Sequence, residues 1–241
     1  MIRFLRSFDP DRIRLLVFDL DGTLIDSRLD LIHSVNATLR HIGRPELDGS
    51  VIASYVGDGA PTLVRRVLGE APDEALMRTA LEYFLSYYRL HKLDHTTLYE
   101  GVSETLERLL HPPAGVSDNR VPRRLAVLTN KPVNASRDII HALGLADFFV
   151  RIYGGNSFPT KKPDPLGAQT LLQETNVLAD ETLMIGDSSI DVLTGRNAGM
   201  WTCGVTYGFA PHSLEQTTPD VLIDRPLDLL ELFTAVAGSI V

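Results

Sequence analysis

Short runs of branched aliphatic residues recur along the chain and alternate with segments of helical periodicity. The runs are IRLLVFD, RLAVLTN, FFVRIYGG, ETLMIGD, MWTCGVTYG and DVLIDRP. Both faces of each run are apolar, which is typical of parallel strands covered by helices on each side. Apolar residues at helical spacing follow in ASRDIIHALGLA, DPLGAQTLLQETNV and SIDVLTGRNAGM. The alternation predicts an α/β protein with a doubly wound, Rossmann-like and mostly parallel sheet.

One interval breaks this alternation. Between about residues 28 and 96 the segments LDLIHSVNATLRHIG, VIASYVGDGAPTLVRRVLGE and DEALMRTALEYFLSYYRLH have helical periodicity, and no convincing strand lies among them. We therefore expect a helical lobe, residues 28–96, inserted after the first strand of an α/β core formed by residues 1–27 and 97–241. Hinges would lie near residues 24–28 and 93–100. Proline, glycine and polar residues crowd residues 111–122, which predicts a surface loop.

Composition narrows the class of protein. The 241 residues are 44% hydrophobic and 22% charged, enough to bury a core. The formal net charge is -8 and the basic residues are dispersed, which disfavours a nucleic-acid partner. Cys203 is the only cysteine, which excludes an internal disulfide and a thiolate metal cluster. No apolar stretch approaches the ~18 residues of a membrane span, and the N-terminus lacks an apolar signal region, so we expect a cytoplasmic protein without a membrane partner.

Polar residues gather where the predicted strands end. Ligands of open parallel sheets bind beyond the carboxyl ends of the strands. In chain order these ends supply Asp19 and Asp21, then Thr129, Asn130 and Lys131, then Lys161 and Lys162, then Asp187, Ser188 and Asp191. Each residue alone is explained as well by a helix cap, a turn or a solvated loop. Four strand ends that all carry groups suited to one ligand favour a single site.

Several other motifs are absent. An EF-hand loop needs glycine at its sixth position and glutamate at its twelfth, whereas here Gly22 is fourth and Asp30 twelfth. Neither GxxxxGK[ST] nor a GxGxxG after a strand occurs. His91 and His95 are four residues apart and could share a helix face, but without a third ligand a zinc site is not expected.

The acids predict a metal-assisted reaction at phosphorus. Asp19, Asp187 and Asp191 would place like charges together, at a cost on the order of 4 kcal/mol per pair at ~4 Å and a dielectric of ~20. Mg²⁺ would relieve this repulsion, because it accepts carboxylate oxygens and completes its coordination with phosphate and water. With the Lys162 ammonium the site could then admit a phosphate, and Thr129 with its neighbouring backbone N–H groups could donate to the phosphoryl oxygens.

The nucleophile follows from the side chains present. A serine would need a general base, and no histidine lies near these strand ends. An aspartate, with an ordinary pKa near ~3.9, is already ionised at neutral pH. Asp19 could therefore attack phosphorus to form an aspartyl phosphate. Asp21 could protonate the leaving oxygen and then deprotonate the hydrolytic water.

The motifs DLDGTLIDS, LTNK, KPDP and GDSSID resemble, in order, the four motifs of the haloacid dehalogenase superfamily of phosphohydrolases. The resemblance implies a catalytic core and the following roles: Asp19 as nucleophile and metal ligand, Asp21 as acid/base and backbone metal ligand, Thr129 and Asn130 with Lys162 on the phosphate, Asp187 on Mg²⁺, and Asp191 as a ligand or a group beside one. The aspartate at position 21 disfavours dehalogenation, because dehalogenases of the superfamily lack it.

Within the superfamily the chain is similar to phosphoglycolate phosphatases, whose cap corresponds to the inserted lobe. This resemblance implies a small phosphorylated metabolite as substrate. Gly57 and Gly59 could let the cap backbone approach it, although both are explained as well by turns. Arg66 could meet a substrate carboxylate, although a solvated helix arginine is the simpler interpretation.

Two other functions stay open on the sequence. A phosphomutase would use the same four motifs and differ in its cap. A phospho-receiver module also gathers aspartates, threonine, lysine and Mg²⁺, but its lysine comes last, whereas Lys162 precedes GDSSID. The oligomeric state is not indicated.

Overall fold

The computed structural model describes residues 1–69, 72–111 and 123–234. Seven strands form one sheet in the order β1-β9-β8-β7-β2-β5-β6, and β3 and β4 form a separate pair. The strands are β1 (Arg3–Phe4), β2 (Leu15–Phe18), β3 (Ile25–Asp26), β4 (Thr97–Leu98), β5 (Arg124–Leu128), β6 (Phe149–Tyr153), β7 (Thr182–Gly186), β8 (Trp201–Val205) and β9 (Val221–Ile223). The helices are α1 (Arg28–His41), α2 (Gly49–Ser54), α3 (Ala60–Leu68), α4 (Glu74–His91), α5 (Val102–Leu110), α6 (Val133–Ala142), α7 (Leu166–Thr175), α8 (Ser189–Asn197) and α9 (Asp228–Thr234), with short 3-10 turns η1 (Pro10–Arg12), η2 (Ala146–Phe148), η3 (Ala179–Glu181) and η4 (Pro211–Leu214).

Helices cover both faces of the sheet. In β2, Leu16 and Phe18 join the core under α5, α6 and α9, whereas Leu15 and Val17 join the core under α7. Gly195 of α8 packs on the second face, against β7 and β8. Every strand pair of the sheet is parallel except β1 with β9. The predicted doubly wound α/β class is confirmed, because strands buried on both faces require helices on both sides.

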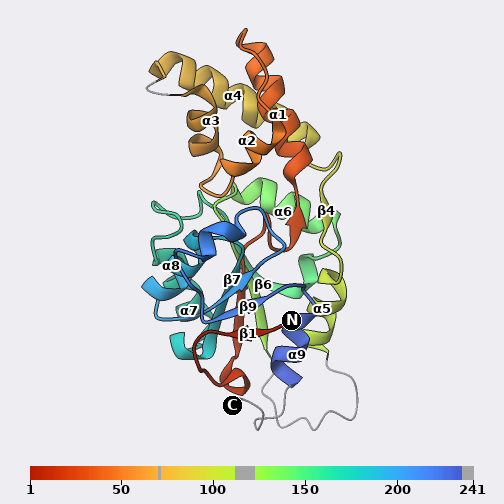
Figure 1. Cartoon of the computed structure of the whole chain (residues 1–241), viewed down its shortest axis with the longest axis vertical. Coiled ribbons are helices and arrows are strands. Elements are labelled where there is room, and N and C mark those ends of the chain that lie inside the picture. Colours follow the sequence, from red (N-terminus) through yellow and green to blue (C-terminus); the bar gives the residue numbers. More distant parts are fainter. Residues whose placement is uncertain (70–71, 112–122, 235–241) are drawn as a thin grey trace.

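Helices α1 to α4 lie together at one end of the molecule (Figure 1). They have a core of their own that includes Leu31, Val35, Ile52, Leu63 and Phe84. The chain enters and leaves this group of helices, the helical lobe, through β3 and β4, which pair antiparallel. These two strands lie within the segments predicted as hinges. The division into two domains at residues 28 and 96 remains a prediction. No helix among the described residues is long and apolar enough to cross a membrane.

The two edges of the sheet differ from expectation. β6 is an edge strand with partly exposed residues, whereas its sequence predicted burial on both faces. At the other edge, β1 was not predicted, since two residues carry no periodicity. The predicted loop at residues 111–122 lies, from residue 112 on, outside the described residues.

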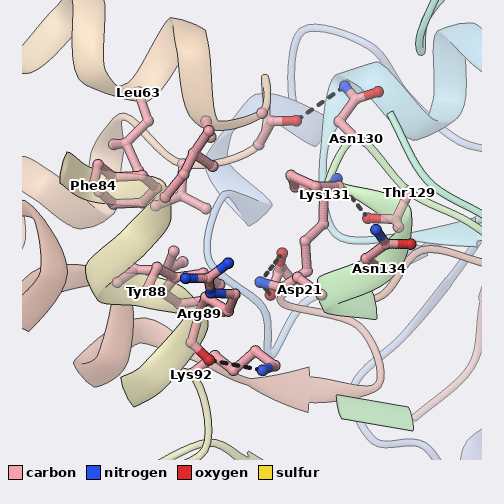
Figure 2. A pocket seen from close by; sticks show the side chains of 18 of the residues that line it. Asp21, Leu63, Phe84, Tyr88, Arg89, Lys92, Thr129, Asn130, Lys131 and Asn134 are labelled. Carbon is pink, nitrogen blue, oxygen red and sulfur yellow. Dashed lines mark hydrogen bonds and ion pairs between the residues drawn. The ribbon is translucent and has the colours of Figure 1, made fainter. Parts of the chain in front are cut away.

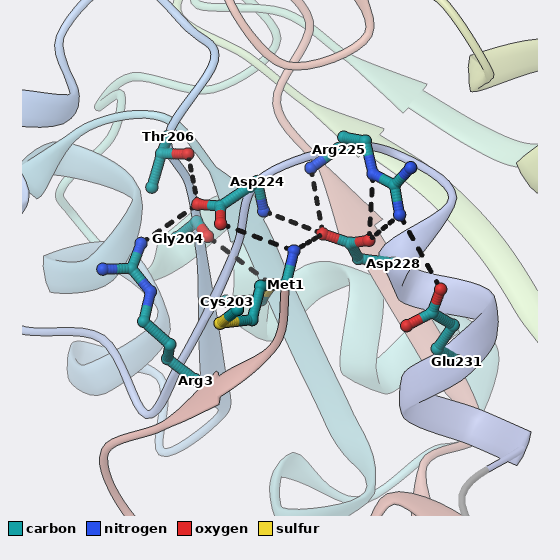
Figure 3. Close-up of polar contacts among 9 residues, drawn as sticks. All are labelled: Met1, Arg3, Cys203, Gly204, Thr206, Asp224, Arg225, Asp228 and Glu231. Atoms are coloured by element: carbon teal, nitrogen blue, oxygen red, sulfur yellow. Dashed lines mark hydrogen bonds and ion pairs between the residues drawn. The ribbon is translucent and has the colours of Figure 1, made fainter.

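A polar network ties β1 to the C-terminal elements (Figure 3). Arg3 pairs with Asp224 at 3.0 Å. The buried Asp228 at the start of α9 accepts hydrogen bonds from the backbone N–H groups of Asp224 at 3.0 Å and Arg225 at 3.2 Å. It also pairs with the Arg225 guanidinium at 2.9 Å. Asp228 therefore satisfies backbone donors in the segment that leads into the helix.

Candidate active site

The predicted site residues come together at the carboxyl end of the sheet. β2 lies between β5 and β7, so Asp19, Thr129 and Asp187 follow three adjacent parallel strands. Lys162 reaches the same place from the loop between β6 and α7. All four residues are buried, with 3 to 8% of their surface exposed. The register of parallel strands thus assembles residues that are far apart in the sequence.

Lys162 is the cation among the acids. Its Nζ lies 2.9 Å from Asp19 Oδ1 and 2.6 Å from Asp191 Oδ1. Burial by itself would lower the pKa of Lys162, but the charges of Asp19 and Asp191 outweigh it and raise that pKa above its ordinary value. The lysine therefore keeps its charge in this buried position.

Three carboxylates lie close together here, and two of them contact this ammonium. Oxygen atoms of Asp19, Asp187 and Asp191 all lie within 4.8 Å of one another. Burial, together with repulsion from Asp191 and Asp19, raises the pKa of Asp187 to about 8. Burial also raises the pKa of Asp19 to about 6, against the opposing effect of Lys162. When all three acids are ionised, one lysine leaves two negative charges uncompensated, so the donor set fits a divalent cation that prefers oxygen ligands.

Two backbone N–H groups bind the Asp187 carboxylate, and two glycines leave room for its side chain. Its Oδ2 accepts from the N–H groups of Phe209 at 2.6 Å and Ala210 at 3.1 Å. A Cβ on Gly22 would lie 2.4 Å from that oxygen, and a Cβ on Gly208 would lie 2.2 Å from Asp187 Cβ. Gly22 also has φ +82°, where a side chain is strained. The glycine of the DLDG motif therefore makes room for Asp187.

Both carboxylate oxygens of Asp191 contact other protein groups. Oδ2 accepts from the Ser188 N–H at 3.2 Å and the Ser188 hydroxyl at 2.7 Å, and completes a capping box at the start of α8. Oδ1 holds Lys162. The sequence allowed two roles for Asp191, a direct metal ligand or a group beside one. These contacts favour the second role, in which Asp191 orients Lys162.

Asp21 lies in the cavity next to the cluster. Its carboxylate accepts from the Ser27 hydroxyl at 2.5 Å and pairs with Lys131 Nζ at 2.9 and 3.0 Å (Figure 2). Lys131 is itself buried, and its Nζ lies 4.7 Å from the centre of the Tyr88 ring. The sequence placed Lys131 at a strand end without giving it a role; its adjacency to Thr129 and Asn130 was the available signal.

Thr129 and Asn130 are both buried, and several of their donors are already used. The Thr129 N–H donates to the Tyr153 carbonyl at 3.0 Å, and its hydroxyl accepts from the Lys131 N–H at 3.3 Å. Asn130 Nδ2 donates to the carbonyls of Gly57 and Lys162, each at 3.1 Å. Asn130 thus connects the helical lobe to the loop that carries Lys162.

Of the three lobe residues proposed to contact the substrate, two lie near the strand ends and one lies outside the cavity. Gly57 and Gly59 do approach the strand ends, since a Cβ on Gly59 would lie 2.9 Å from the Asn130 carbonyl oxygen. Arg66 pairs with Asp58 at 2.6 Å and does not line the cavity. Its contact with a substrate remains a prediction without geometric support.

A cavity of about 200 Å³ opens between α3, α4 and the strand ends (Figure 2). On the sheet side it is lined by Asp19, Asp21, Thr129, Asn130 and Lys131, and on the lobe side by Leu63, Phe84, Tyr88, Arg89 and Lys92 among others. Lys92 pairs with Asp138 at 3.2 Å. The Arg89 guanidinium has no hydrogen bond or ion pair with any residue in the described part of the chain.

Comparison with known proteins agrees with this geometry. The family model of the haloacid dehalogenase-like hydrolases matches residues 16–205. The chain belongs to this family. This hydrolase is 38% identical over 229 residues to a phosphoglycolate phosphatase of Vibrio vulnificus strain YJ016, covering 91% of this chain and 96% of the relative. It is 38% identical over 207 residues to a phosphoglycolate phosphatase of Chromobacterium violaceum, covering 83% and 88%.

A solved structure gives the same result for the fold of this hydrolase. The crystal structure described as a predicted phosphoglycolate phosphatase from Haemophilus somnus 129pt superposes with a TM-score of 0.84 at 30% identity, covering 92% of this chain and 98% of that one. This hydrolase is accordingly an enzyme of the phosphatase type. Tyr88 and Arg89 were not predicted to line its cavity, because helical periodicity identifies the buried stripe of α4, which includes Tyr88, but not which residues of the helix face a cavity.

Proposed function

We propose that this hydrolase is a Mg²⁺-dependent phosphomonoesterase that acts on a small phosphorylated metabolite through an aspartyl phosphate on Asp19. The observation that carries the proposal is the buried cluster of Asp19, Asp187 and Asp191 around one lysine, which leaves two negative charges uncompensated. A divalent ion would balance these two charges, and the resulting neutral site could then admit a phosphate dianion.

The residues divide the reaction into two displacements. An Asp19 carboxylate oxygen attacks phosphorus, forms a new P–O bond and displaces the substrate oxygen, which takes a proton from Asp21. Lys162 Nζ offers donors to the phosphoryl oxygens. Asp21 then takes a proton from a water molecule, which attacks phosphorus and returns Asp19 as a carboxylate. When bound by Asp19, Asp187 and the Asp21 carbonyl, Mg²⁺ supplies charge compensation for the carboxylates and the phosphoryl group.

Cavity size and charge support a short, carboxylate-bearing substrate such as phosphoglycolate. The volume of about 200 Å³ is below the ~300–1,000 Å³ typical of sites for drug-sized ligands. Lys131 and Lys92 are already paired with Asp21 and Asp138. Arg89 is thus the cavity cation left to meet a second anionic group of the substrate. The names of the relatives from Vibrio vulnificus and Chromobacterium violaceum agree with this choice.

Phosphate release from phosphoglycolate and from p-nitrophenyl phosphate tests the proposal. We expect both activities to require Mg²⁺ and to be abolished in Asp19→Asn. Turnover by that variant would refute the role of Asp19. A sugar phosphate with a bisphosphate primer should yield free phosphate; an isomerised sugar phosphate would indicate a phosphomutase instead.

The substrate assignment has its own test. Loss of a charged hydrogen bond costs about 1.5–3 kcal/mol, so Arg89→Ala should raise KM for phosphoglycolate by roughly 10- to 150-fold and leave p-nitrophenyl phosphate nearly unchanged. Arg66→Ala is the matched control, because Arg66 does not line the cavity. Equal effects of Arg89→Ala on both substrates would contradict carboxylate recognition without touching the role of Asp19.

A further inference from the structure

A second cluster of potential metal ligands lies outside the active-site cavity. It consists of Asp30 and His33, one turn apart on α1, and His95, in the segment between α4 and β4. One ligand atom from each residue lies within 4.8 Å of the other two. The two imidazole rings meet edge to face, with centroids 5.2 Å apart. Sequence reasoning paired His95 with His91 instead, but His91 turns to Asp94, at 2.8 Å.

Asp30 is a rigid anchor for this cluster. Its carboxylate is buried, with 1% of the residue exposed. It accepts from the His95 N–H at 3.0 and 3.1 Å, from the Thr96 N–H at 2.9 Å and from the Thr96 hydroxyl at 2.7 Å. Oδ1 takes part only in the His95 contact, which leaves it an acceptor position. Such outer hydrogen bonds are the usual way in which a ligating carboxylate is fixed in orientation.

Both histidine side chains are accessible to a metal ion. They are exposed, and apart from their contact with each other neither imidazole has a polar partner among the residues that the structure describes. Two imidazole nitrogens and one carboxylate oxygen make up a common ligand set for Zn²⁺, with bonds of ~2.0–2.2 Å and a fourth position for water. A tetrahedral site needs ligand atoms roughly 3.4 Å apart, so the two exposed imidazoles would have to turn from their present positions, in which the ligand atoms lie within 4.8 Å of one another.

We propose that Asp30, His33 and His95 bind a divalent transition metal of the Zn²⁺ class. The nitrogen ligands distinguish this site from the all-oxygen cluster at the strand ends, since Mg²⁺ prefers oxygen. The inference does not depend on the proposed function.

The position of the cluster means that a bound metal would affect the movement of the helical lobe against the sheet. Asp30 and His33 follow β3, by which the chain enters the helical lobe, and His95 precedes β4, by which it leaves. A bound ion would join the entering and leaving segments beside the β3–β4 pair. It would therefore stabilise the junction of lobe and sheet and restrict the movement of one against the other, which lowers turnover when lobe opening limits the rate.

Metal titration of the purified protein in saturating Mg²⁺ tests the site. Co²⁺ reports nitrogen ligation by its visible absorption, and Zn²⁺ binding is followed by calorimetry. We expect one transition-metal site in the wild-type protein and in the control His91→Ala. In His33→Ala and His95→Ala the affinity should fall at least about 10-fold. His33→Gln guards against an effect of the cavity left by alanine.

The outcomes are decisive in both directions. Unchanged Co²⁺ spectra and Zn²⁺ affinity in the double variant His33→Ala/His95→Ala would overturn the site. Zn²⁺ should also raise Tm and slow turnover in wild type and in His91→Ala, but not in the double variant. Binding that leaves Tm and turnover unchanged would overturn the clamp between lobe and sheet.

Discussion

Replacing Lys162 by methionine removes the only cation that contacts Asp19 and Asp191 among the described residues and keeps a side chain of similar length. The lysine is 4% exposed, and its two ion pairs measure 2.9 and 2.6 Å. Without it the three carboxylates of the cluster face one another with no protein charge to offset them. We therefore expect both a loss of stability and a loss of activity in Lys162→Met.

The magnitude follows from burial. Removal of one partner of a buried ion pair costs about 3–5 kcal/mol, because the other charge stays desolvated. We expect a decrease of at least about 3 kcal/mol in the free energy of unfolding when no divalent ion is present. Mg²⁺ should restore part of this loss, since it supplies positive charge to the same carboxylates. The rate should fall by roughly 10²- to 10³-fold, the usual effect of losing one donor to a transition-state anion.

Urea unfolding at pH 7, in EDTA and in Mg²⁺, measures the stability, and p-nitrophenyl phosphate hydrolysis measures the rate. Lys161→Met is the matched control, because the neighbouring Lys161 is exposed and contacts only the Asp58 carbonyl and the Thr62 hydroxyl within the described ranges. It should lose less than about 1 kcal/mol. If Lys162→Met is as stable as Lys161→Met in EDTA, the proposed charge balance between Lys162 and the three carboxylates is refuted.

Three further outcomes follow from the same geometry. Gly22→Ala should weaken Mg²⁺ affinity at least about 10-fold, because its Cβ meets Asp187; wild-type affinity by calorimetry would contradict this. EDTA should abolish hydrolysis and added Mg²⁺ restore it, so full activity in chelator would exclude a metal. Asp228→Ala should lower the free energy of unfolding by about 2–3 kcal/mol, since it leaves donors unpaired. Burial acts to raise the pKa of Asp228, but hydrogen bonds from the Met1 ammonium and Arg225 hold it below its ordinary value. Its stabilisation is therefore present at neutral pH and lost as pH falls below about 4, and equal acid unfolding midpoints of variant and wild type would contradict it.

Much of the fold was predictable because each buried parallel strand is a continuous apolar run. The end of such a run also marks the edge of the sheet, which is why Asp19, Thr129 and Asp187 could be placed together from the order of residues alone. The two-residue strands β1, β3 and β4 were not predictable, since they arise from tertiary pairing and have no period of their own.

The residues of the site that the sequence did not predict were missed for a different reason. Lys131 and Arg89 lie at the interface of lobe and sheet, and their positions depend on how the helices meet the strand ends. His33 and His95 come together because α1 packs on α4 and β3 pairs with β4. A pattern read along one segment identifies which side is buried, but contacts between segments follow from packing.

The most direct test of the central claim is the chemical identity of the phosphorylated residue. Asp21→Asn should form the acyl phosphate on Asp19 and hydrolyse it slowly, so acid quenching during turnover of p-nitrophenyl phosphate should trap it. Mass spectrometry of the peptides should then show one added phosphoryl group at Asp19, removed by hydroxylamine and absent from Asp19→Asn/Asp21→Asn. Normal turnover without any label at Asp19, or a label on another residue, would contradict the account.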